Sequence, residues 1–393
     1  MTSSTILDVI LVLVLLGLFV YGYRSGLVRS LAGIVGLVAG GVAAFFLVPI
    51  VGSWVPDPQW RTPATLGTAI VLVLGGLSIG GSIGYALRRQ VHKTPLGVID
   101  RMLGAVLSTV VSALVLSMVA MSVGSLGVPF VSPAVASSSV IRSIDSLTPT
   151  QVKAFLAQVR SAAVDEGIPS IVEAFNGPVP AIPEVNTGGP DLVAAARSVV
   201  RITGNAYACG QNQSGSGFVV SEDRIVTNAH VVAGVTQPVV EAPGLGAPAG
   251  RVVYFDPVND LAVIAVDGLT AQALPLAGNL DVGSAAIVDG YPFGGPFRSG
   301  AAQVISVGPL QVNDIYGDAT AERNVYTLAA DVQQGQSGGP LLSESGEVVG
   351  VIFAKSADTS GVGYALAMEE VEPVAVQAPD LQAEVSSGTC DRG

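Results

Sequence analysis

The stretch Asp331-Val-Gln-Gln-Gly-Gln-Ser-Gly-Gly-Pro-Leu-Leu342 indicates how the C-terminal half of the chain folds and which chemistry it carries. Ser337 stands among three glycines, at positions 335, 338 and 339. Glycine has no Cβ atom, so such a turn admits unusual backbone angles and the close approach of another chain. A serine presented in this way is typical of a nucleophile, and the backbone N–H groups of Gly335 and Ser337 could converge on an oxyanion. Because Gly-Ser-Gly-Gly also occurs in flexible linkers, the hypothesis depends on the rest of the chain.

From Val199 onward the chain consists of short runs of β-branched and aromatic residues separated by Gly, Asn, Asp and Pro. Such spacing is typical of an all-β sandwich or barrel. The expected strands are Gly217–Val220, Arg224–Thr227, Arg251–Phe255, Leu261–Val266, Ala285–Val288, Gln303–Val307, Val325–Leu328, Glu347–Phe353 and Val362–Leu366. The segment is long enough for two small barrels.

Only two histidines occur in the chain, and one of them, His230, lies in the run Ile225–Val232. An imidazole titrates near ~6.5, so it can take a proton from a serine hydroxyl and return it to a leaving group. The alternative is a buried structural histidine near the end of a strand.

Asp260 comes just before the apolar run Leu261–Val266. A carboxylate held at the start of a strand can accept the imidazole N–H and fix the tautomer of the ring. Alternatively Asp260 is a turn residue, as Asp256 and Asn259 are expected to be. The order His, Asp, Ser along one all-β segment is that of the chymotrypsin-class triad.

Four motifs in this order resemble the trypsin-like peptidases of the HtrA type: Thr227-Asn-Ala-His230, Asp260-Leu-Ala-Val263, Gly290-Tyr-Pro-Phe293 and Gly335-Gln-Ser-Gly-Gly-Pro340. The resemblance implies a chymotrypsin-like double β-barrel with its site in the cleft between the barrels. It assigns Ser337 as nucleophile, His230 as general base and Asp260 as its orienting acid. It also makes Gly335 and Ser337 the oxyanion hole, without a cofactor or a metal. Gln336 departs from the Asp of many such enzymes, so activation by a newly formed N-terminus is not expected.

The front of the chain has a different composition. Half of all residues are hydrophobic and only 12% are charged, and residues 1–130 carry seven Lys/Arg but three Asp/Glu, against eleven and twenty-seven in the remainder. Four apolar stretches have the ~20 residues needed to span a bilayer. These are Ile6–Tyr23, Leu31–Val51, Thr65–Leu87 and Met102–Val123. The acidic remainder argues against nucleic-acid binding, which needs clustered Lys and Arg.

Positive charges indicate how these helices lie in the plasma membrane. Arg24 and Arg29 follow the first span, and four basic residues lie between Arg88 and Arg101, so both loops are expected to be cytoplasmic. The N-terminus and everything after residue 125 are then extracytoplasmic. The pattern resembles the colicin V production protein family. The whole chain is similar to the membrane-anchored acid-resistance serine proteases of actinobacteria.

The expected domains are a four-helix transmembrane domain at 1–125, an extracytoplasmic linker with an amphipathic helix after Thr148 at 126–195, and a protease domain at 196–393. Glycines at helical spacing would allow close helix contact or self-association in the bilayer, although glycine is also common in membrane helices generally. They are Gly36, Gly40, Gly76, Gly80 and Gly84.

Asp331 stands six residues before Ser337, where the resembled enzymes place the acid at the base of the substrate pocket. A carboxylate there would favour Lys or Arg side chains of the substrate. The alternative is an Asp331 that is exposed or paired with an arginine.

Cys209 and Cys390 are the only two cysteines. An even count in an oxidising compartment predicts a disulfide that would join both ends of the protease domain, the alternative being two unpaired thiols. In the resembled proteases a matching bond supports activity, so we expect reduction to weaken the enzyme.

The favoured hypothesis is a membrane-anchored serine endopeptidase that cleaves cell-envelope proteins through an acyl-enzyme, with a role in envelope and acid stress implied by the resemblance. Its partners would be protein or peptide substrates and the lipid bilayer. A second hypothesis is a membrane scaffold or sensor whose barrel binds peptides without cutting them. A third, a transporter, is disfavoured because few charged groups lie within the spans.

Overall fold

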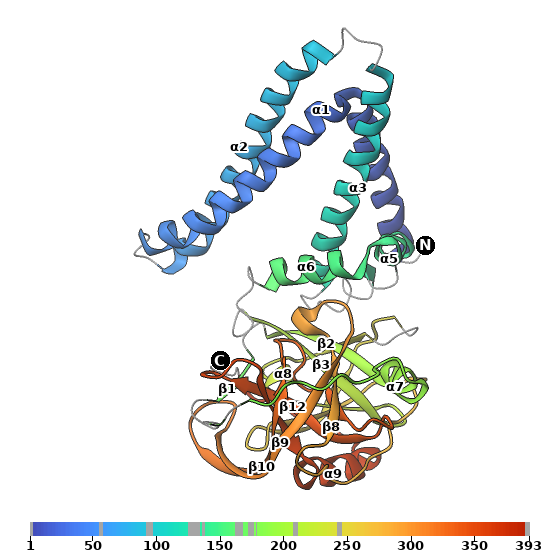
Figure 1. The fold of residues 1–393 in the computed structure, drawn as a ribbon, viewed down its shortest axis with the longest axis vertical. Helices are drawn as coiled ribbons and strands as arrows, with labels where there is room; N and C mark the ends of the chain where they lie inside the picture. Colours follow the sequence, from blue (N-terminus) through green and yellow to red (C-terminus); the bar gives the residue numbers. More distant parts are fainter. Residues whose placement is uncertain are drawn as a thin grey trace. The chain divides into compact units, whose positions relative to one another are not determined.

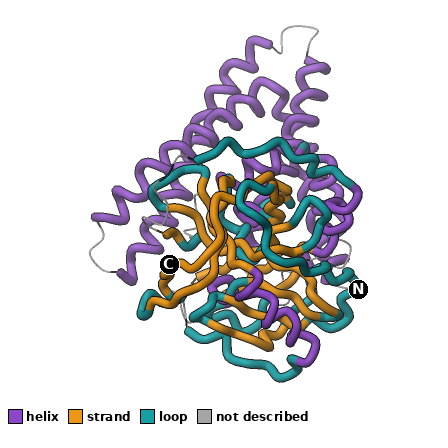
Figure 2. The backbone as a smooth tube through the Cα atoms, turned by 60° about the horizontal axis from the view of Figure 1, so that its bottom comes forward, coloured by secondary structure: helices purple, strands orange, loops and turns teal. Residues whose placement is uncertain are grey.

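The computed structural model describes residues 3–54, 58–91, 97–124, 134–135, 138–161, 168–171, 177, 179–206, 211–241 and 246–389. The chain forms two compact units, one of Asp8–Ser117 and one of Met1–Leu7 with Met118–Gly393 (Figure 1). The first unit is helical and the second contains the β-sheets (Figure 2).

The helical unit consists of α1 (Ser3–Trp54), α2 (Pro58–Val91) and α3 (Gly97–Gly124). Among the described residues, three helical segments are long and apolar enough to cross a membrane: Ser4–Val48, Gly67–Leu87 and Gly97–Ala120. The first two expected spans both lie in α1, which is interrupted at Gly26 (φ 73°, ψ 166°). The four spans expected from the sequence require α1 to cross the membrane twice, and this stays a prediction.

The interruption at Gly26 is stabilised by α3. Its backbone geometry belongs to glycine alone, and it frees an amide from the helical ladder. The N–H of Val28 donates to the carboxylate of Asp100 at 3.2 Å. A Cβ on Gly104 would lie 2.4 Å from the carbonyl carbon of Gly26, so α3 packs directly on the break.

The glycines of α1 and α2 face each other, which confirms that they allow close helix contact. A Cβ on Gly36 would lie 2.1 Å from the carbonyl oxygen of Gly76, and one on Gly80 would lie 2.2 Å from that of Ala32. Backbones approach this closely only where side chains are absent. These contacts join two helices of the same chain.

Two short helices precede the sheets, α5 (Ser139–Leu147) and α6 (Thr150–Ser161). The helix expected after Thr148 is α6, although Thr148 itself ends α5, where its hydroxyl donates to the carbonyl of Ile144 at 2.6 Å. Strand β1 (Ser170–Ile171), helix α7 (Pro190–Ala195) and a 3-10 turn, η1 (Ala196–Ser198), complete the approach to the protease domain.

The first sheet has six strands in the order β5-β2-β3-β4-β7-β6. They are β2 (Val199–Ala206), β3 (Gln211–Ser221), β4 (Arg224–Thr227), β5 (Val239–Glu241), β6 (Arg251–Asp256) and β7 (Leu261–Ala265). The edge strand β5 is connected to the segment before β6, since the N–H of Val240 donates to Pro248 and that of Gly250 to Pro238. The sheet therefore curls back on itself.

The second sheet has the order β1-β12-β11-β8-β9-β10-β13, and β12 also pairs with β13. Its members after β1 are β8 (Ala285–Gly290), β9 (Arg298–Asn313), β10 (Thr320–Ala330), β11 (Pro340–Leu342), β12 (Val348–Ser356) and β13 (Val362–Ala367). The extra pairing closes the strands from β8 to β13 into a barrel, with β1 added in parallel at the free edge of β12. Two curled sheets confirm the expected chymotrypsin-like fold.

The remaining elements lie between and after these strands: α8 (Ala229–Val232), η2 (Pro292–Gly294), α9 (Met368–Gln377) and η3 (Ala378–Asp380). Helix α9 buries Met368, Val371 and Val374 against a core that both sheets share. Because β2, β5, β11 and α9 are short or lack a clear period, the sequence patterns did not indicate them.

Candidate active site

His230 lies on the single turn of α8, directly after strand β4. Asn228 has the extended backbone of an N-cap residue (φ −80°, ψ 152°), which turns the chain from strand to helix. All four residues of α8 are buried. The imidazole is therefore carried by a short, well-packed element.

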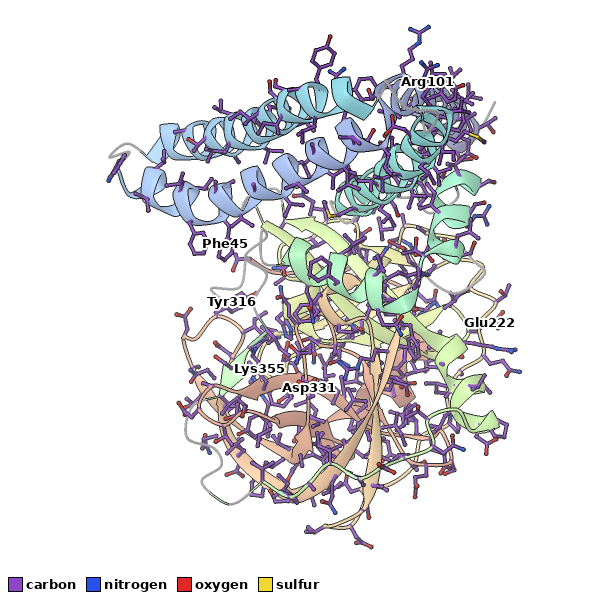
Figure 3. The ribbon with its side chains drawn as sticks, turned by 45° about the horizontal axis from the view of Figure 1, so that its top comes forward. Phe45, Arg101, Glu222, Tyr316, Asp331 and Lys355 are labelled. Atoms are coloured by element: carbon purple, nitrogen blue, oxygen red, sulfur yellow. The ribbon has the colours of Figure 1, made fainter. Side chains whose placement is uncertain are left out.

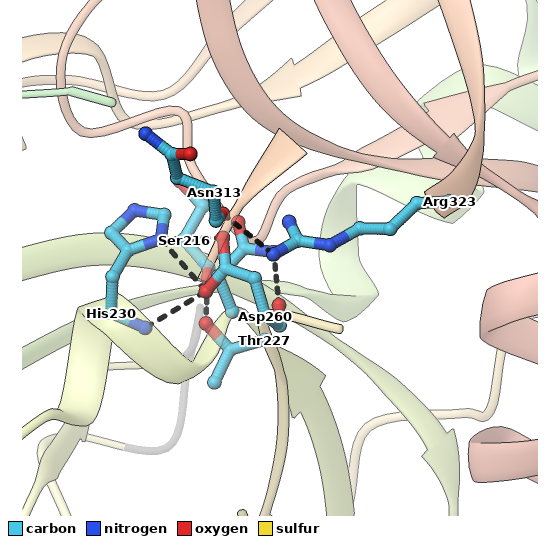
Figure 4. A network of polar contacts seen from close by, with 7 residues as sticks. Ser216, Thr227, His230, Asp260, Asn313 and Arg323 are labelled. Atoms are coloured by element: carbon cyan, nitrogen blue, oxygen red, sulfur yellow. Dashed lines mark hydrogen bonds and ion pairs between the residues drawn. The ribbon is translucent and has the colours of Figure 1, made fainter. Parts of the chain in front are cut away.

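Asp260 binds both the ring and the backbone of His230 (Figure 4). Nδ1 of the imidazole lies 2.8 Å from Oδ2 and 3.0 Å from Oδ1 of the carboxylate, and the N–H of His230 donates to Oδ1 at 3.0 Å. Since an ionised carboxylate only accepts, this pairing places the proton of the neutral ring on Nδ1 and leaves Nε2 as an acceptor.

The backbone of Asp260 is held in an uncommon conformation. Its φ of 56° lies in the left-handed region, which Asp tolerates better than most residues. The side-chain amide of Asn228 donates to the carbonyl of Asp260 at 2.7 Å and fixes it there. Asp256 is the turn residue expected from the sequence, because its carboxylate accepts from the N–H groups of Val258 and Asn259.

Ser337 lies on the loop between β10 and β11. The N–H of Gly338 donates to the carbonyl of Ile352 at 2.8 Å, and the N–H of Ile352 donates to Gly339 at 2.9 Å, so β12 holds the loop from one side. From the other side, the N–H of Ser216 on β3 donates to the carbonyl of Ser337 at 2.8 Å. The side chain is 2% exposed, and its Oγ has no hydrogen-bond partner in the described part of the chain.

The Ser337 loop packs directly on the start of α8. A Cβ on Gly338 would lie 2.3 Å from Oγ1 of Thr227 and 3.0 Å from the backbone nitrogen of Asn228. Only a glycine at position 338 allows the loop to approach Thr227 and Asn228 this closely, and its φ of 80° also favours glycine. The structure therefore places the Ser337 loop of the second sheet against the start of the element that carries His230, whose ring is bound by Asp260.

The two predicted oxyanion donors are available for a ligand. Gly335 has a φ of 87°, and a Cβ there would lie 2.5 Å from the carbonyl of Tyr291. Within the residues that the structure describes, neither the N–H of Gly335 nor that of Ser337 donates a hydrogen bond. Both are free to bind a developing negative charge.

Arg323 on β10 is a buried charge that the sequence did not single out. It is 1% exposed, donates from Nη2 to the carbonyl of Asn313 at 2.8 Å, and stacks on Phe353 with 5.9 Å between Cζ and the ring centroid. Burial lowers the pKa of Arg323, while the negative charges of Asp260 and Asp256 act in the opposite direction. Its guanidinium contributes positive potential at the carboxylate that binds His230.

Asp289 is a second buried carboxyl group, near the end of β8. Neither of its oxygens has a hydrogen-bond partner among the described residues. Burial raises the pKa of Asp289 to about 6. The hydroxyl of Ser299, which lies opposite on β9, lowers this pKa by a smaller amount, although it forms no hydrogen bond with the carboxyl group. An aspartate at the end of a strand reads as a turn residue in sequence, so no pattern indicated this group.

Asp331, labelled in Figure 3, lies at the surface with 54% of its side chain exposed. Its Oδ2 is 3.6 Å from Nη1 of Arg298, and its Oδ1 accepts from the side chain of Gln333. The neighbouring Val332 points inward instead and packs against Gly363. This placement favours the alternative in which Asp331 is exposed and paired with arginine, and a preference for basic substrates stays a prediction.

Cys209 and Cys390 lie outside the described residues, so the disulfide stays a prediction. No cluster of three or more His, Cys, Asp or Glu side chains suited to a metal ion occurs in the part of the chain that the structure describes.

Comparisons with known proteins agree with both units. Residues 7–149 match the family model of the colicin V production protein, and residues 215–351 match that of a trypsin-like peptidase domain. Serine protease Rv3671c of Mycobacterium tuberculosis is 33% identical over 398 residues, which cover 99% of this chain and 100% of the relative. The chain belongs to this family of membrane serine proteases.

Solved structures and more distant relatives agree with this assignment. The active form of the Rv3671c protease is 36% identical and superposes with a TM-score of 0.53, covering 56% of this chain and 100% of that one. The Do-like serine protease HtrB of Bacillus subtilis is 30% identical over 41% of this chain and 38% of its own length. Membership in the Rv3671c family confirms the serine endopeptidase expected from the motifs, together with its membrane helices.

Proposed function

We propose that this serine protease is an extracytoplasmic endopeptidase, anchored in the plasma membrane, that cleaves cell-envelope proteins by acyl-enzyme chemistry. The observation that carries the proposal is the pairing of His230 with Asp260 beside the Ser337 loop. It leaves Nε2 of the imidazole as the acceptor that a serine hydroxyl needs.

The proposed reaction begins when Oγ of Ser337 attacks the carbonyl carbon of the scissile peptide and its proton passes to Nε2 of His230. Asp260 stabilises the imidazolium that forms, since its carboxylate already accepts the N–H at Nδ1. The carbonyl oxygen gains the negative charge and binds the N–H groups of Gly335 and Ser337.

The tetrahedral intermediate then collapses. The C–N bond breaks, His230 returns the proton to the leaving amine, and an acyl-enzyme remains on Ser337. The same imidazole deprotonates a water molecule, which attacks the ester. The carboxylic acid product is released, and the hydroxyl of Ser337 is regenerated when His230 returns the proton. The cycle needs no oxidant, reductant or metal ion.

The extracytoplasmic location is supported by the distribution of basic residues. Arg24 and Arg29 lie on one side of the first expected span, and Arg88, Arg89 and Arg101 flank the connection between the last two. By the positive-inside rule these segments are cytoplasmic, which puts the protease domain on the opposite side. An acid-stress role is supported by Asp289, because its raised pKa of about 6 contributes stability at low pH that is lost as the pH rises.

A membrane-impermeant, biotinylated fluorophosphonate tests activity and location together. Because this probe phosphonylates only an activated serine, we expect it to label the full chain in intact spheroplasts and to lose all labelling in Ser337→Ala. Ser343→Ala removes a serine six residues further on, outside the site, and should label like the wild type.

Three outcomes are informative. Labelling that appears only after permeabilisation would place the protease domain in the cytoplasm and contradict the proposed location. Labelling that survives Ser337→Ala would assign the nucleophile to another serine. An unlabelled wild-type chain would support the rival hypothesis of a scaffold that binds peptides without cutting them.

A further inference from the structure

Ser216 is a fully buried serine of strand β3 whose polar groups are all used beside the catalytic loop. Its N–H donates to the carbonyl of Ser337 at 2.8 Å, and its Oγ donates to the carbonyl of Gly335 at 2.7 Å. The same Oγ accepts from the N–H of Tyr291 at 3.0 Å. Its carbonyl accepts from Oγ1 of Thr227 at 2.7 Å (Figure 4).

These bonds complete a set of four consecutive carbonyl groups in the loop. The carbonyl of Gln334 accepts from the N–H of Phe293 at 2.6 Å, and that of Gln336 accepts from Gly339 at 2.9 Å. Ser216 binds the remaining two, at Gly335 and Ser337. Because a trans peptide unit is planar, a carbonyl held on one side directs the N–H of the same unit to the other side.

The two oxyanion donors belong to peptide units of this set. The N–H of Gly335 shares a plane with the carbonyl of Gln334, and the N–H of Ser337 shares one with the carbonyl of Gln336. The peptide unit that carries the N–H of Gly335 is joined at the Cα atom of Gly335 to the unit that carries its carbonyl. Gly335 has a φ of 87°, and because it lacks a Cβ atom the backbone can rotate easily at this point. The bond from Ser216 to the carbonyl of Gly335 opposes that rotation at 2.7 Å, and it is shorter than the bond on the other side of the same peptide unit, where the N–H of Gln336 donates to Gln333 at 3.1 Å.

Space around Ser216 is matched to a serine. A Cβ on Gly290 would lie 2.8 Å from its Oγ, and one on Gly338 would lie 2.3 Å from its carbonyl oxygen. The surrounding glycines therefore leave room for this hydroxyl between the two sheets and for little else.

We propose that Ser216 is the positioning residue of the oxyanion hole, because its hydroxyl bonds the carbonyl of Gly335 and so keeps the N–H groups of Gly335 and Ser337 aimed at the substrate. The inference rests on the proposed catalytic role of Ser337. Without the hydroxyl, both the carbonyl of Gly335 and the N–H of Tyr291 lose a buried partner, so the peptide unit turns to find another.

The test compares Ser216→Ala with Ser214→Ala in the full chain. Ser214 lies two residues earlier on β3, and its buried Oγ has no hydrogen-bond partner among the described residues, so its removal is a matched control. Losing one oxyanion donor lowers kcat about 10²–10³-fold. We expect such a loss of kcat in Ser216→Ala, with KM within about twofold, and wild-type kinetics in Ser214→Ala.

The affinity for a peptide boronate distinguishes a positioning role of Ser216 from a merely structural one. The boronate adduct with Ser337 carries the negative oxygen of the tetrahedral intermediate, so its affinity should fall by the same factor as kcat/KM, while a product peptide binds unchanged. Equal losses of boronate and product binding would overturn the proposal, as would a kcat within about threefold of the wild type.

Two controls keep the interpretation unambiguous. If Ser216→Ala does not fold, Ser216→Cys retains a weak donor in the same place and is expected to lose about tenfold in kcat; full activity would contradict the role assigned to the hydroxyl. If the wild type itself neither cleaves peptides nor takes the fluorophosphonate, the proposed function fails, which differs from an active wild type with an equally active Ser216→Ala.

Discussion

Among the described residues of the protease domain, Asp260 and Asp289 are buried carboxyl groups with different surroundings. Asp260 is bound by the ring and the backbone N–H of His230, and Arg323 adds positive potential nearby. Asp289 has no such partners, and burial raises its pKa to about 6. A buried carboxyl group that lacks hydrogen-bond donors retains its proton to higher pH, as Asp289 does.

The raised pKa of Asp289 links its protonation to folding. Below the unfolded pKa of about 3.8 the carboxyl group is protonated in both states, so its burial carries no free-energy cost of desolvating a charge. As pH rises to about 6, the unfolded chain ionises first, so the free energy of unfolding falls; above that the loss is complete. The difference between the two pKa values corresponds to roughly 3 kcal/mol.

Asp289→Asn should therefore change how stability depends on pH. Relative to this variant, the wild type is expected to lose roughly 2.4 kcal/mol of unfolding free energy between pH 4 and pH 7. Chemical unfolding of both chains across this range measures the difference. Asp267→Asn, at a side chain that is 83% exposed, is the matched control and should show no such trend. A constant difference between wild type and Asp289→Asn would show that the carboxyl is not protonated in the folded state near pH 5.

At the scale of elements, strand β12 connects the catalytic loop with the linker. Its Ile352 exchanges hydrogen bonds with Gly338 and Gly339, and its free edge further along is paired with β1. The N–H of Lys355 donates to Pro169 at 3.1 Å, and that of Ala357 donates to Ile171 at 3.0 Å. Helix α6 of the same linker contacts the Pro292–Gly294 turn, whose Phe293 holds the carbonyl of Gln334.

Displacing β1 should make substrates bind better. We expect an extended peptide that reaches Ser337 to add to the edge of β12 through main-chain hydrogen bonds, and β1 occupies part of that edge. Ile168 anchors the segment, since it is 8% exposed and packs with Val332 and Ile352. Ile168→Asp removes about 1.5–3 kcal/mol of apolar burial. We expect KM for a short peptide to fall about 3- to 10-fold with kcat unchanged.

The matching control for Ile168→Asp is Ile182→Asp, since Ile182 lies in the same linker but is 42% exposed. Its kinetics should equal those of the wild type. An unchanged or higher KM in Ile168→Asp, with an intact melting transition, would show that β1 does not compete with the substrate.

The sequence predicted the elements whose patterns are local. Strand β4 has the expected bounds, and His230, Asp260 and Ser337 each stand in a short motif that one element presents. Contacts between distant segments were not predictable in this way. Gly215-Ser216-Gly217 resembles a linker until β3 places it against the Ser337 loop, and a two-residue strand such as β1 has no period to detect.

At the scale of the whole protease domain, the site depends on how its two sheets are held together. His230 and Asp260 come from the six-stranded sheet, and Ser337 comes from a loop of the seven-stranded sheet. After α9 the chain returns to the first sheet, where the N–H of Val385 donates to Val252 and the hydroxyl of Ser387 donates to Val235 at 2.7 Å. The tail thus fastens the end of the second sheet close to α8.

A disulfide between Cys209 and Cys390 would make this attachment covalent. It would close a loop of about 180 residues, which the chain-entropy model equates with a ceiling near ~5 kcal/mol and a usual gain of ~2–4 kcal/mol. We expect reductant to lower the melting temperature by roughly 5–15 °C and to lower kcat/KM, because the tail then detaches from the segment beside His230. Calorimetry and peptide hydrolysis, each with and without reductant, measure both effects.

The control is the double variant Cys209→Ser/Cys390→Ser. Its melting temperature and kcat/KM should match those of the reduced wild type and should not change when reductant is added. Equal stability and activity of the oxidised and reduced wild type would show that the tail stays in place through its hydrogen bonds to Val252 and Val235 alone.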